Sequence, residues 1–218
     1  MSIVPVSTGN PIDSNMWLIT GSSNILIDTG TGESYGPDYT GGLVRTMGPY
    51  LGGRGLSAIV LTHCHIDHVG GAAGLSEHYG CPVYIGSGDA PAVRSADPRL
   101  TVSGMFRIPL SPIECQGVDE GYVFDIGEHV LRVIETPGHT AGGICLFDEV
   151  TGALFSGDTL FAPGVGRTDL PGGSLEALAG SLRKLCNVNI KTVYPGHGPI
   201  GYDGRKTLDD ALGMVGLR

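Results

Sequence analysis

Basic side chains are scarce in this sequence. Its 218 residues include 13 Lys and Arg against 22 Asp and Glu, so the formal net charge at pH 7 is -9. Proteins that bind a nucleic-acid backbone neutralise its phosphates with many basic side chains. The charge balance therefore argues against an extended phosphate-binding surface, and we expect no nucleic-acid partner.

Long apolar runs and paired cysteines are also missing. No run approaches the roughly 18 apolar residues of a membrane span, and the N-terminal MSIVPVSTGN lacks the basic segment and apolar core of a secretory signal. The five cysteines are scattered without CxxC spacing, which argues against a disulfide framework or a thiolate zinc site. We expect a cytoplasmic protein with reduced thiols and no membrane partner. The sequence is compatible with either a monomer or a homo-oligomer.

Apolar residues are numerous enough, at 41% of the chain, to build a sizeable core, and we expect one compact domain over residues 1–218. Alternating strand and helix patterns predict an α/β fold of packed layers. Residues 86–115, with four prolines, predict an irregular excursion. The expected strands lie at 16–20, 24–28, 57–62, 82–85, 122–126, 129–135, 143–147, 153–157 and 191–194. Two of these strands form a hairpin around Gly127, and helices are expected near 41–51, at 71–79, behind an N-cap at Ser174, and in the C-terminal TLDDALGMV.

Three histidines and an aspartate crowd the segment THCHIDHVGG, residues 62–71, directly after the apolar run AIVL. A lone histidine is most often a surface or hydrogen-bonded residue. Three imidazoles and a carboxylate within one loop are instead typical of a metal site. The candidate ligands are His63, His65, Asp67 and His68.

Three further segments end a mostly apolar strand in a His or Asp beside glycine: RVIETPGH, ALFSGD and TVYPGH. Because ligands characteristically bind beyond the carboxyl ends of buried strands, we expect His139, Asp158 and His197 to join the first four. Five imidazoles and two carboxylates are too many for one tetrahedral ion and suit two divalent ions that share a bridge. Taken singly, the two histidines could be turn residues and the aspartate a turn former or helix cap.

Four other residues are expected to have supporting or structural roles. Asp28 also ends an apolar strand, in NILIDTG, and we favour a role in fixing a ligand or loop, with a simple turn former as the alternative. Strand alternation points Cys64 away from the neighbouring histidines, as a buried thiol. His78 and His129 lie outside any strand-end motif, which predicts surface or hydrogen-bonded side chains.

The ordered set of motifs, HxHxDH followed by PGH, SGD and PGH and preceded by LIDTG, resembles the metallo-β-lactamase superfamily over roughly residues 12–200. The resemblance implies an αββα sandwich, in which two mixed β-sheets pack face to face with helices outside. It also implies two metal positions and a bridging water or hydroxide. One metal would take His63, His65 and His139, the other Asp67, His68 and His197, and Asp158 would bridge them.

A closer resemblance, through GRTD in LFAPGVGRTDLPGGS and the ending YPGH, is to the glyoxalase II and persulfide dioxygenase branch. Arg167 stands where glyoxalase II carries a lysine that contacts glutathione, so it is the candidate substrate-binding residue; a salt bridge to Asp169 is the structural alternative. About 20 residues follow His197, so we expect a compact relative without the C-terminal helical domain of glyoxalase II. The dioxygenase branch implies instead one iron at positions matching His63, His139 and Asp158.

The charge of the expected cluster favours hydrolysis. Two divalent ions outweigh a bridging hydroxide and two carboxylates by one positive charge, which stabilises an anionic tetrahedral intermediate. A thioester suits this site because a thiolate leaves without a strong general acid. We therefore predict a hydrolase of a small acyl thioester, with Asp67 orienting the nucleophile and two divalent ions, Zn with Fe or Mn as alternatives. The competing hypotheses are an iron-dependent persulfide dioxygenase and a metal-binding regulatory protein without turnover, and a β-lactamase is less favoured.

Overall fold

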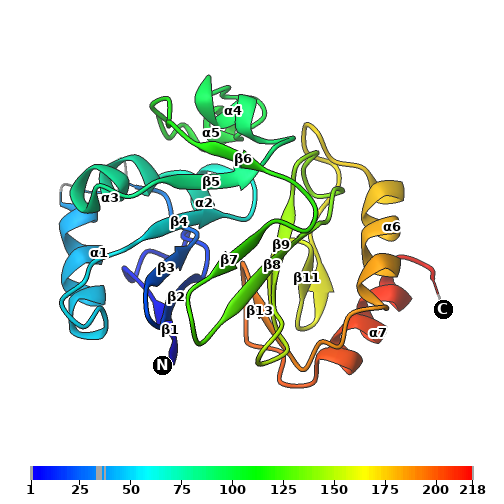
Figure 1. The fold of residues 1–218 in the computed structure, drawn as a ribbon. Coiled ribbons are helices and arrows are strands. Elements are labelled where there is room, and N and C mark those ends of the chain that lie inside the picture. Colours follow the sequence, from blue (N-terminus) through cyan, green and yellow to red (C-terminus); the bar gives the residue numbers. More distant parts are fainter. Residues whose placement is uncertain (1, 33–35, 37, 218) are drawn as a thin grey trace.

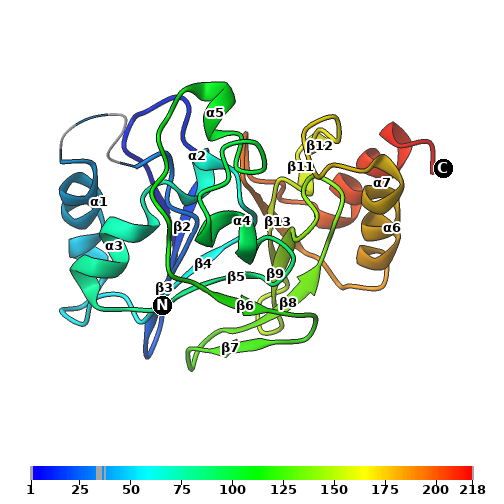
Figure 2. The ribbon, with the colours of Figure 1, turned by 90° about the horizontal axis from the view of Figure 1, so that it is seen from above.

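The computed structural model describes residues 2–32, 36 and 38–217 of the chain. Within these residues, two mixed β-sheets pack face to face, and helices cover the outer side of each sheet (Figure 1). Figure 2 shows the same layers from above, in the order helix, sheet, sheet, helix. The αββα sandwich predicted from the sequence is therefore confirmed.

In the part of the chain that the structure describes, the first sheet has six strands in the order β1-β2-β3-β4-β5-β6. β1, β2 and β3 pair antiparallel, whereas β3 to β6 run parallel. β1 and β6 were not among the strands expected from the sequence. β1 contains Pro5, and as an edge strand it tolerates the missing N–H. The strand bounds are Ser2–Val6 (β1), Met16–Thr20 (β2), Asn24–Ile27 (β3), Ala58–Leu61 (β4), Val83–Gly86 (β5) and Gln116–Val118 (β6).

Among the described residues the second sheet has five strands, in the order β13-β10-β9-β8-β7. β10 and β13 are parallel, and β9 is antiparallel to both β8 and β10. β7 and β8 form the hairpin predicted around Gly127, whose φ of 86° suits glycine. The bounds are Val123–Asp125 (β7), Val130–Glu135 (β8), Ile144–Asp148 (β9), Ala153–Gly157 (β10) and Thr192–Pro195 (β13), with a small separate hairpin of Leu160–Phe161 (β11) and Gly164–Val165 (β12).

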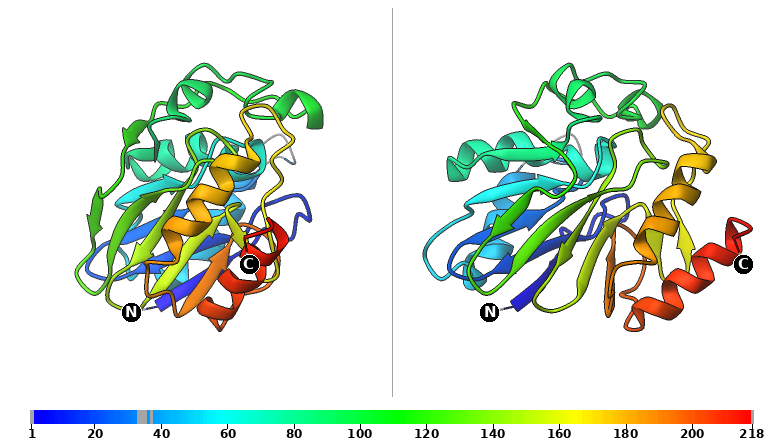
Figure 3. Two further views of the ribbon diagram at one scale, coloured as in Figure 1. Left: turned by 90° about the vertical axis from the view of Figure 1, so that its right-hand side faces the viewer. Right: turned by 45° about the vertical axis from the view of Figure 1, so that its right-hand side comes forward.

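Apolar side chains fill the space between the sheets and beneath the helices. Ile27 and Val60 of the first sheet share one buried cluster with Leu146 and Phe155 of the second. Strands buried on both faces need nearly continuous apolar sequence, which explains runs such as AIVL. Further clusters pack α1 (Tyr39–Met47) and α3 (Ala72–Tyr79) on the first sheet, and α6 (Leu175–Leu185) and α7 (Gly204–Met214) on the second. Figure 3 shows α6 and α7 in front of the second sheet.

The predicted helices are present with small shifts at their ends. Ser174 caps α6 as expected, since its Oγ accepts a 3.2 Å hydrogen bond from the backbone N–H of Ala177. The segment 86–115 is less irregular than predicted, because it contains α4 (Ala90–Arg94) and α5 (Ser103–Phe106). The remaining short helices are α2 (Ile66–Val69) and the 3₁₀ turn η2 (Gly48–Tyr50). Every helix in the described residues is too short or too polar to span a bilayer.

Candidate metal centre

Strands from both sheets end at one edge of the sandwich. His139, Asp158 and His197 follow the carboxyl ends of β8, β10 and β13, which run in the same direction. The end of β4 lies against this edge, because the carbonyl of Thr62 accepts a 2.9 Å hydrogen bond from the N–H of Ile144. The strand ends thus bring together all the ligands predicted from the sequence: His63, His65, Asp67, His68, His139, Asp158 and His197.

The first group of ligand atoms comes from His63, His65 and His139 and lies within 4.8 Å. Nδ1 of His65 is 2.9 Å from Nε2 of His139. We assign the proton of the His139 ring to Nδ1, because that atom donates to the carbonyl of Arg167 at 2.7 Å. Nε2 of His139 then presents a lone pair to His65, an arrangement that needs a proton or a cation between the rings.

The second group comes from Asp67, His68 and His197, again within 4.8 Å. Oδ2 of Asp67 lies 3.0 Å from Nε2 of His197 and 3.6 Å from Nε2 of His68. The His68 side chain is fully buried, whereas that of His197 is 38% exposed. The second group therefore meets solvent on the His197 side.

Asp158 lies between the two groups. Its Oδ2 is 3.4 Å from Nε2 of His139 in the first group, and its Oδ1 is 3.4 Å from Nε2 of His68 in the second. His63, His68 and Asp158 also form a set of ligand atoms within 4.8 Å, which joins the two groups. The carboxylate thus lies between the two groups, where a bridging ligand would be, and its bridging role stays a prediction. A side chain at Gly196 would collide with Asp158 and His68, so this approach requires glycine.

Several buried polar atoms of the cluster have no hydrogen-bond partner among the described residues. Nε2 of His63, Nε2 of His68 and Oδ1 of Asp158 are all in this state. The opposite side of each ring is satisfied: Nδ1 of His63 is 3.1 Å from Oγ1 of Thr62, and Nδ1 of His68 is 2.8 Å from Asp28. Buried polar atoms normally have partners because desolvation without one is unfavourable. Converging imidazole and carboxylate lone pairs are the donor set of a divalent cation, so these residues fit a metal centre.

The surroundings shift the pKa values of the cluster. Burial, and then the neighbouring His68, lowers the pKa of His63 well below its ordinary value, and burial with His139 lowers that of His65 to about 3. Burial opposes ionisation of Asp158, but the imidazoles, His68 first, hold its pKa below the ordinary value. At His68, burial is outweighed by Asp28 and the other carboxylates, which raise the pKa well above the ordinary value. The cluster therefore favours neutral imidazoles at His63 and His65, ionised carboxylates, and a positive charge near His68.

Asp28 supports the second group from behind, in line with the role we favoured from the sequence. Its Oδ2 accepts hydrogen bonds from Nδ1 of His68 at 2.8 Å and from Oγ1 of Thr62 at 2.9 Å, and its Oδ1 accepts from the Thr62 N–H at 2.8 Å. Its φ of 59° lies in the left-handed region, which aspartate enters more easily than most residues. These contacts fix both the His68 ring and the loop after β4.

Asp89 is a supporting residue that the sequence analysis missed. This buried carboxylate accepts hydrogen bonds from the N–H of Cys64 at 3.0 Å, Oγ1 of Thr140 at 2.7 Å and the N–H of Gly142 at 2.7 Å. Cys64 lies between two histidines of the first group, and Thr140 follows His139. Asp89 therefore ties together the two loops that carry the first group. A signal was present in YIGSGD, which resembles ALFSGD in ending an apolar strand with glycine and aspartate.

The residues given structural roles from the sequence behave as expected. The buried thiol of Cys64 donates to the carbonyl of Leu100 at 3.4 Å. His129 is buried and its Nδ1 lies 2.6 Å from Oδ2 of Asp148. His78 is exposed on α3. None of these side chains belongs to a group of metal-ligand atoms found in the described part of the chain.

A cavity of about 330 Å³ lies beside the cluster. Arg167 lines it, but Nε and Nη2 of its guanidinium each donate a 2.7 Å hydrogen bond to Asp169. The hydrogen bonds from Arg167 lower the pKa of Asp169 to about 2. The salt bridge between Arg167 and Asp169, which was the structural alternative, is thus present. A substrate-binding role of Arg167 stays a prediction. Outside the cluster the lining residues are Val102, Met105, Phe106, Phe161, Val165, Arg167 and Leu170.

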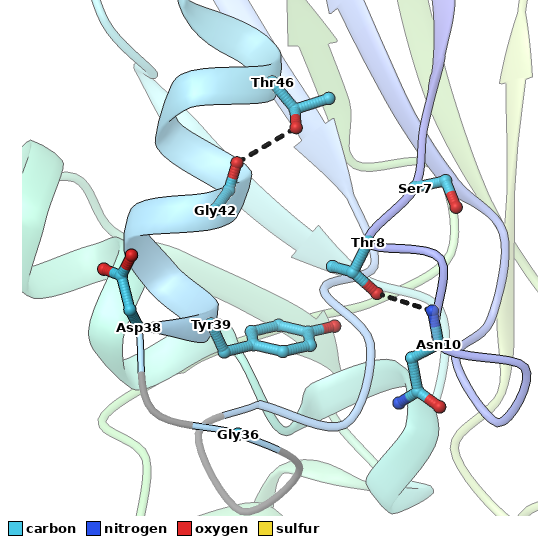
Figure 4. Close-up of a pocket in the computed structure, with 8 residues that line it drawn as sticks. All are labelled: Ser7, Thr8, Asn10, Gly36, Asp38, Tyr39, Gly42 and Thr46. Carbon is cyan, nitrogen blue, oxygen red and sulfur yellow. Dashed lines mark hydrogen bonds between the residues drawn. The ribbon is translucent and has the colours of Figure 1, made fainter.

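A second cavity, of about 280 Å³, lies between residues 7–10 and α1 (Figure 4). Its polar groups bond within the protein: Oγ1 of Thr46 donates to the carbonyl of Gly42 at 3.0 Å, and the hydroxyl of Tyr39 donates to Asp13 at 2.8 Å. Histidine and cysteine are absent from its described lining. Among the described residues, only the first of these two cavities is lined by histidines that could bind a metal.

Comparison with known proteins identifies the family. The model of the metallo-beta-lactamase superfamily matches residues 9–197, a span that contains the whole cluster. The chain belongs to this superfamily. It is 35% identical over 201 residues to the probable metallo-hydrolase MJ0888 of Methanocaldococcus jannaschii, covering 88% of this chain and 91% of that one. It is also 31% identical over 185 residues to the thioesterase pkgB of Emericella nidulans, covering 84% of this chain but 45% of that protein.

Two solved structures resemble this one closely. The TTHA1623 protein in a di-iron-bound form has a TM-score of 0.76 and 34% identity, covering 95% of this chain and 96% of that one. The BLEG-1 B3 metallo-beta-lactamase has a TM-score of 0.76 and 27% identity, covering 97% of each chain. These relationships support a metallo-hydrolase with a centre for divalent metal. The glyoxalase II branch stays a prediction.

Proposed function

We propose that this protein hydrolyses a small acyl thioester with the help of two divalent metal ions, in the manner of hydroxyacylglutathione hydrolase. The observation that carries the proposal is the pair of ligand groups on either side of Asp158, beside an open cavity. The similarity to a protein named as a thioesterase supports the substrate class. Zinc is the expected metal, with iron or manganese as alternatives, and the di-iron form of a similar structure supports a pair of ions.

The residues of the cluster would bind two ions and orient the attacking water. His63, His65 and His139 would hold one ion, and Asp67, His68 and His197 the other, with Asp158 shared. Bound ions would polarise the substrate carbonyl and lower the pKa of a coordinated water to about 7. Asp67 lines the cavity, and although burial opposes its ionisation, His68 and His197 lower its pKa. Its carboxylate can therefore accept a hydrogen bond from the attacking water and orient it.

The cavity offers little to protonate a leaving group. Outside the cluster its described lining is apolar except for Arg167, whose pKa is raised further by the hydrogen bonds to Asp169. Tyr194, near the end of β13, is not among the described lining residues, and its ring packs against Trp17 and Phe155 with centroids 5.1 and 5.0 Å away. Amine and alkoxide leaving groups need a general acid, whereas a thiolate, with a conjugate-acid pKa of about 8.5, leaves unaided. Thioesters are the acyl substrates that this site can best cleave.

Substrates matched in their acyl group test the proposal. Metal-loaded protein should cleave an acetyl or lactoyl thioester much faster than the corresponding oxygen ester or amide. A cephalosporin belongs in the same series, because a B3 metallo-beta-lactamase is among the similar structures. Faster cleavage of the cephalosporin or the amide than of any thioester would contradict the proposal.

A further inference from the structure

The cavity beside the metal cluster has one polar side and one apolar side. The apolar side, the apolar wall, comes from three segments: the stretch around α5, the β11–β12 hairpin and the loop before α6. Its members are Val102, Met105, Phe106, Phe161, Val165 and Leu170. Met105 is 61% exposed and Phe106 is 48% exposed, although both side chains are large and apolar. Exposed apolar side chains gathered beside convergent polar groups are typical of a surface that a ligand covers.

The backbone beneath the apolar wall is anchored to the metal-binding loop. Val102, which precedes α5, has a φ of 51°, in a region that disfavours β-branched residues and persists only where the surroundings enforce it. Val102 packs in a buried cluster with Ile66 and Ile108, and the N–H of Ile66 donates to the carbonyl of Thr101 at 2.9 Å. Because Ile66 directly precedes Asp67, the wall is held at a defined position relative to the cluster.

A charged thiol carrier would find few partners in this cavity. Arg167 is the basic side chain among the described lining residues, and two of its nitrogens already bind Asp169. The chain as a whole carries a net charge of -9, which disfavours polyanions. Recognition of the substrate must then depend on the part of it that contacts the apolar wall.

We infer that the apolar wall binds the acyl group, and that the enzyme selects thioesters by an apolar acyl chain or ring more than by the thiol carrier. This inference rests on the proposed function. The carbonyl then lies at the cluster, the acyl group covers Met105 and Phe106, and the carrier extends into solvent. Burial of each methylene is worth about 0.8 kcal/mol, roughly fourfold in kcat/KM. A hexanoyl thioester has four methylenes more than an acetyl one, and burial of about three of them against the apolar wall should favour hexanoyl by about 50-fold.

A series of acyl chains on two carriers tests the inference. Acetyl, butanoyl and hexanoyl thioesters of glutathione and of neutral N-acetylcysteamine would be compared on the metal-loaded wild type, on the double variant Met105→Ala/Phe106→Ala, and on Met214→Ala. Met214 is a matched control, 60% exposed on α7 and outside the cavity lining. We expect the wild type and Met214→Ala to prefer hexanoyl by about 50-fold on both carriers, and the double variant by about fivefold or less. Equal rates along the acyl series, or a preference set by the carrier, would overturn the inference.

A binding measurement separates this inference from the proposed function. Ketone analogues, with a methylene in place of the thioester sulfur, are titrated by calorimetry into metal-loaded protein whose metal content and melting temperature match the wild type. We expect the hexanoyl-type analogue to bind the wild type more tightly than the acetyl type, and the double variant to lose this difference. That result would support binding of the acyl group by the apolar wall even if no thioester is cleaved. Thioester cleavage without a preference for chain length would agree with the proposed function but contradict the inference. Equal affinity of both analogues for the wild type also removes it.

Discussion

Nδ1 of His68 donates a 2.8 Å hydrogen bond to Oδ2 of Asp28, and both side chains are buried. In an Asp28→Asn variant, either orientation of the amide places its NH₂ against a donor, the His68 ring or the Thr62 N–H. We expect affinity for metal at the second group to fall by about 10- to 100-fold, because such supporting contacts orient the ligand. Calorimetric metal titration, with metal analysis of the isolated protein, measures the effect. Wild-type affinity for both ions would show that the contact is not needed.

Asp158 faces both ligand groups, whereas His197 belongs to one. Asp158→Ala should therefore deplete both metal positions, and His197→Ala mainly one. Metal content per chain after gel filtration in buffer treated to remove free metal distinguishes the two variants. An Asp158→Ala protein with full metal content and wild-type turnover would exclude the bridging role.

Asp89 holds the two loops of the first group through three hydrogen bonds of 2.7 to 3.0 Å. Asp89→Asn leaves at least one buried donor unpaired, which should reduce the free energy of unfolding by about 1–3 kcal/mol. We also expect metal affinity at the first group to fall by about 10-fold. Asp119→Asn, an exposed change of the same chemistry, is the control for both measurements. If Asp89→Asn lost stability but kept metal affinity, the residue would have a purely structural role.

The guanidinium of Arg167 is paired with Asp169 on an exposed loop, and such pairs are weak enough for a substrate carboxylate to compete. Asp169→Asn should lower KM for an anionic glutathione thioester by about threefold, because it frees the guanidinium. Arg167→Gln should raise the same KM by at most about 10-fold, which corresponds to one charge-assisted hydrogen bond already shared with Asp169. The neutral N-acetylcysteamine thioester provides the comparison. Equal effects on both substrates would assign the pair a structural role only.

Sequence reasoning succeeded where pattern and chemistry coincide. β4 and β10 are buried on both faces, so their apolar runs stand out, and each run is followed within two residues by a polar side chain, His63 or Asp158. Those ends meet because the strands run in a common direction, which is a property of the fold class.

The remaining features depend on contacts between distant segments. Asp89 acts through backbone N–H groups far along the chain, and although YIGSGD resembles ALFSGD, these partners follow only from the folded structure. β1 was missed because its Pro5 is acceptable only at a sheet edge, a position known from the assembled sheet. α5 was missed because Val102 adopts a left-handed conformation that only its surroundings enforce.

Asp67 separates the hydrolase from the dioxygenase alternative. In a binuclear hydrolase it holds the second ion and orients the nucleophile, so Asp67→Asn should lower kcat by orders of magnitude while the fold is retained. A dioxygenase with one iron at His63, His139 and Asp158 would have no ligand role for Asp67, and iron binding would survive the substitution. The 3.0 Å contact between Asp67 and His197 would let both side chains bind the second ion of a binuclear centre.

The central claim is tested most directly by single-turnover cleavage of lactoylglutathione or hexanoyl-N-acetylcysteamine under strict exclusion of oxygen, with wild-type and Asp67→Asn protein loaded with zinc, manganese or iron. We predict release of the thiol by the wild type without oxygen, at close to two metal ions per chain, and loss of that release in Asp67→Asn. Oxygen consumption on glutathione persulfide by the iron-loaded protein, together with no thioester cleavage in any metal form, would contradict the hydrolase assignment.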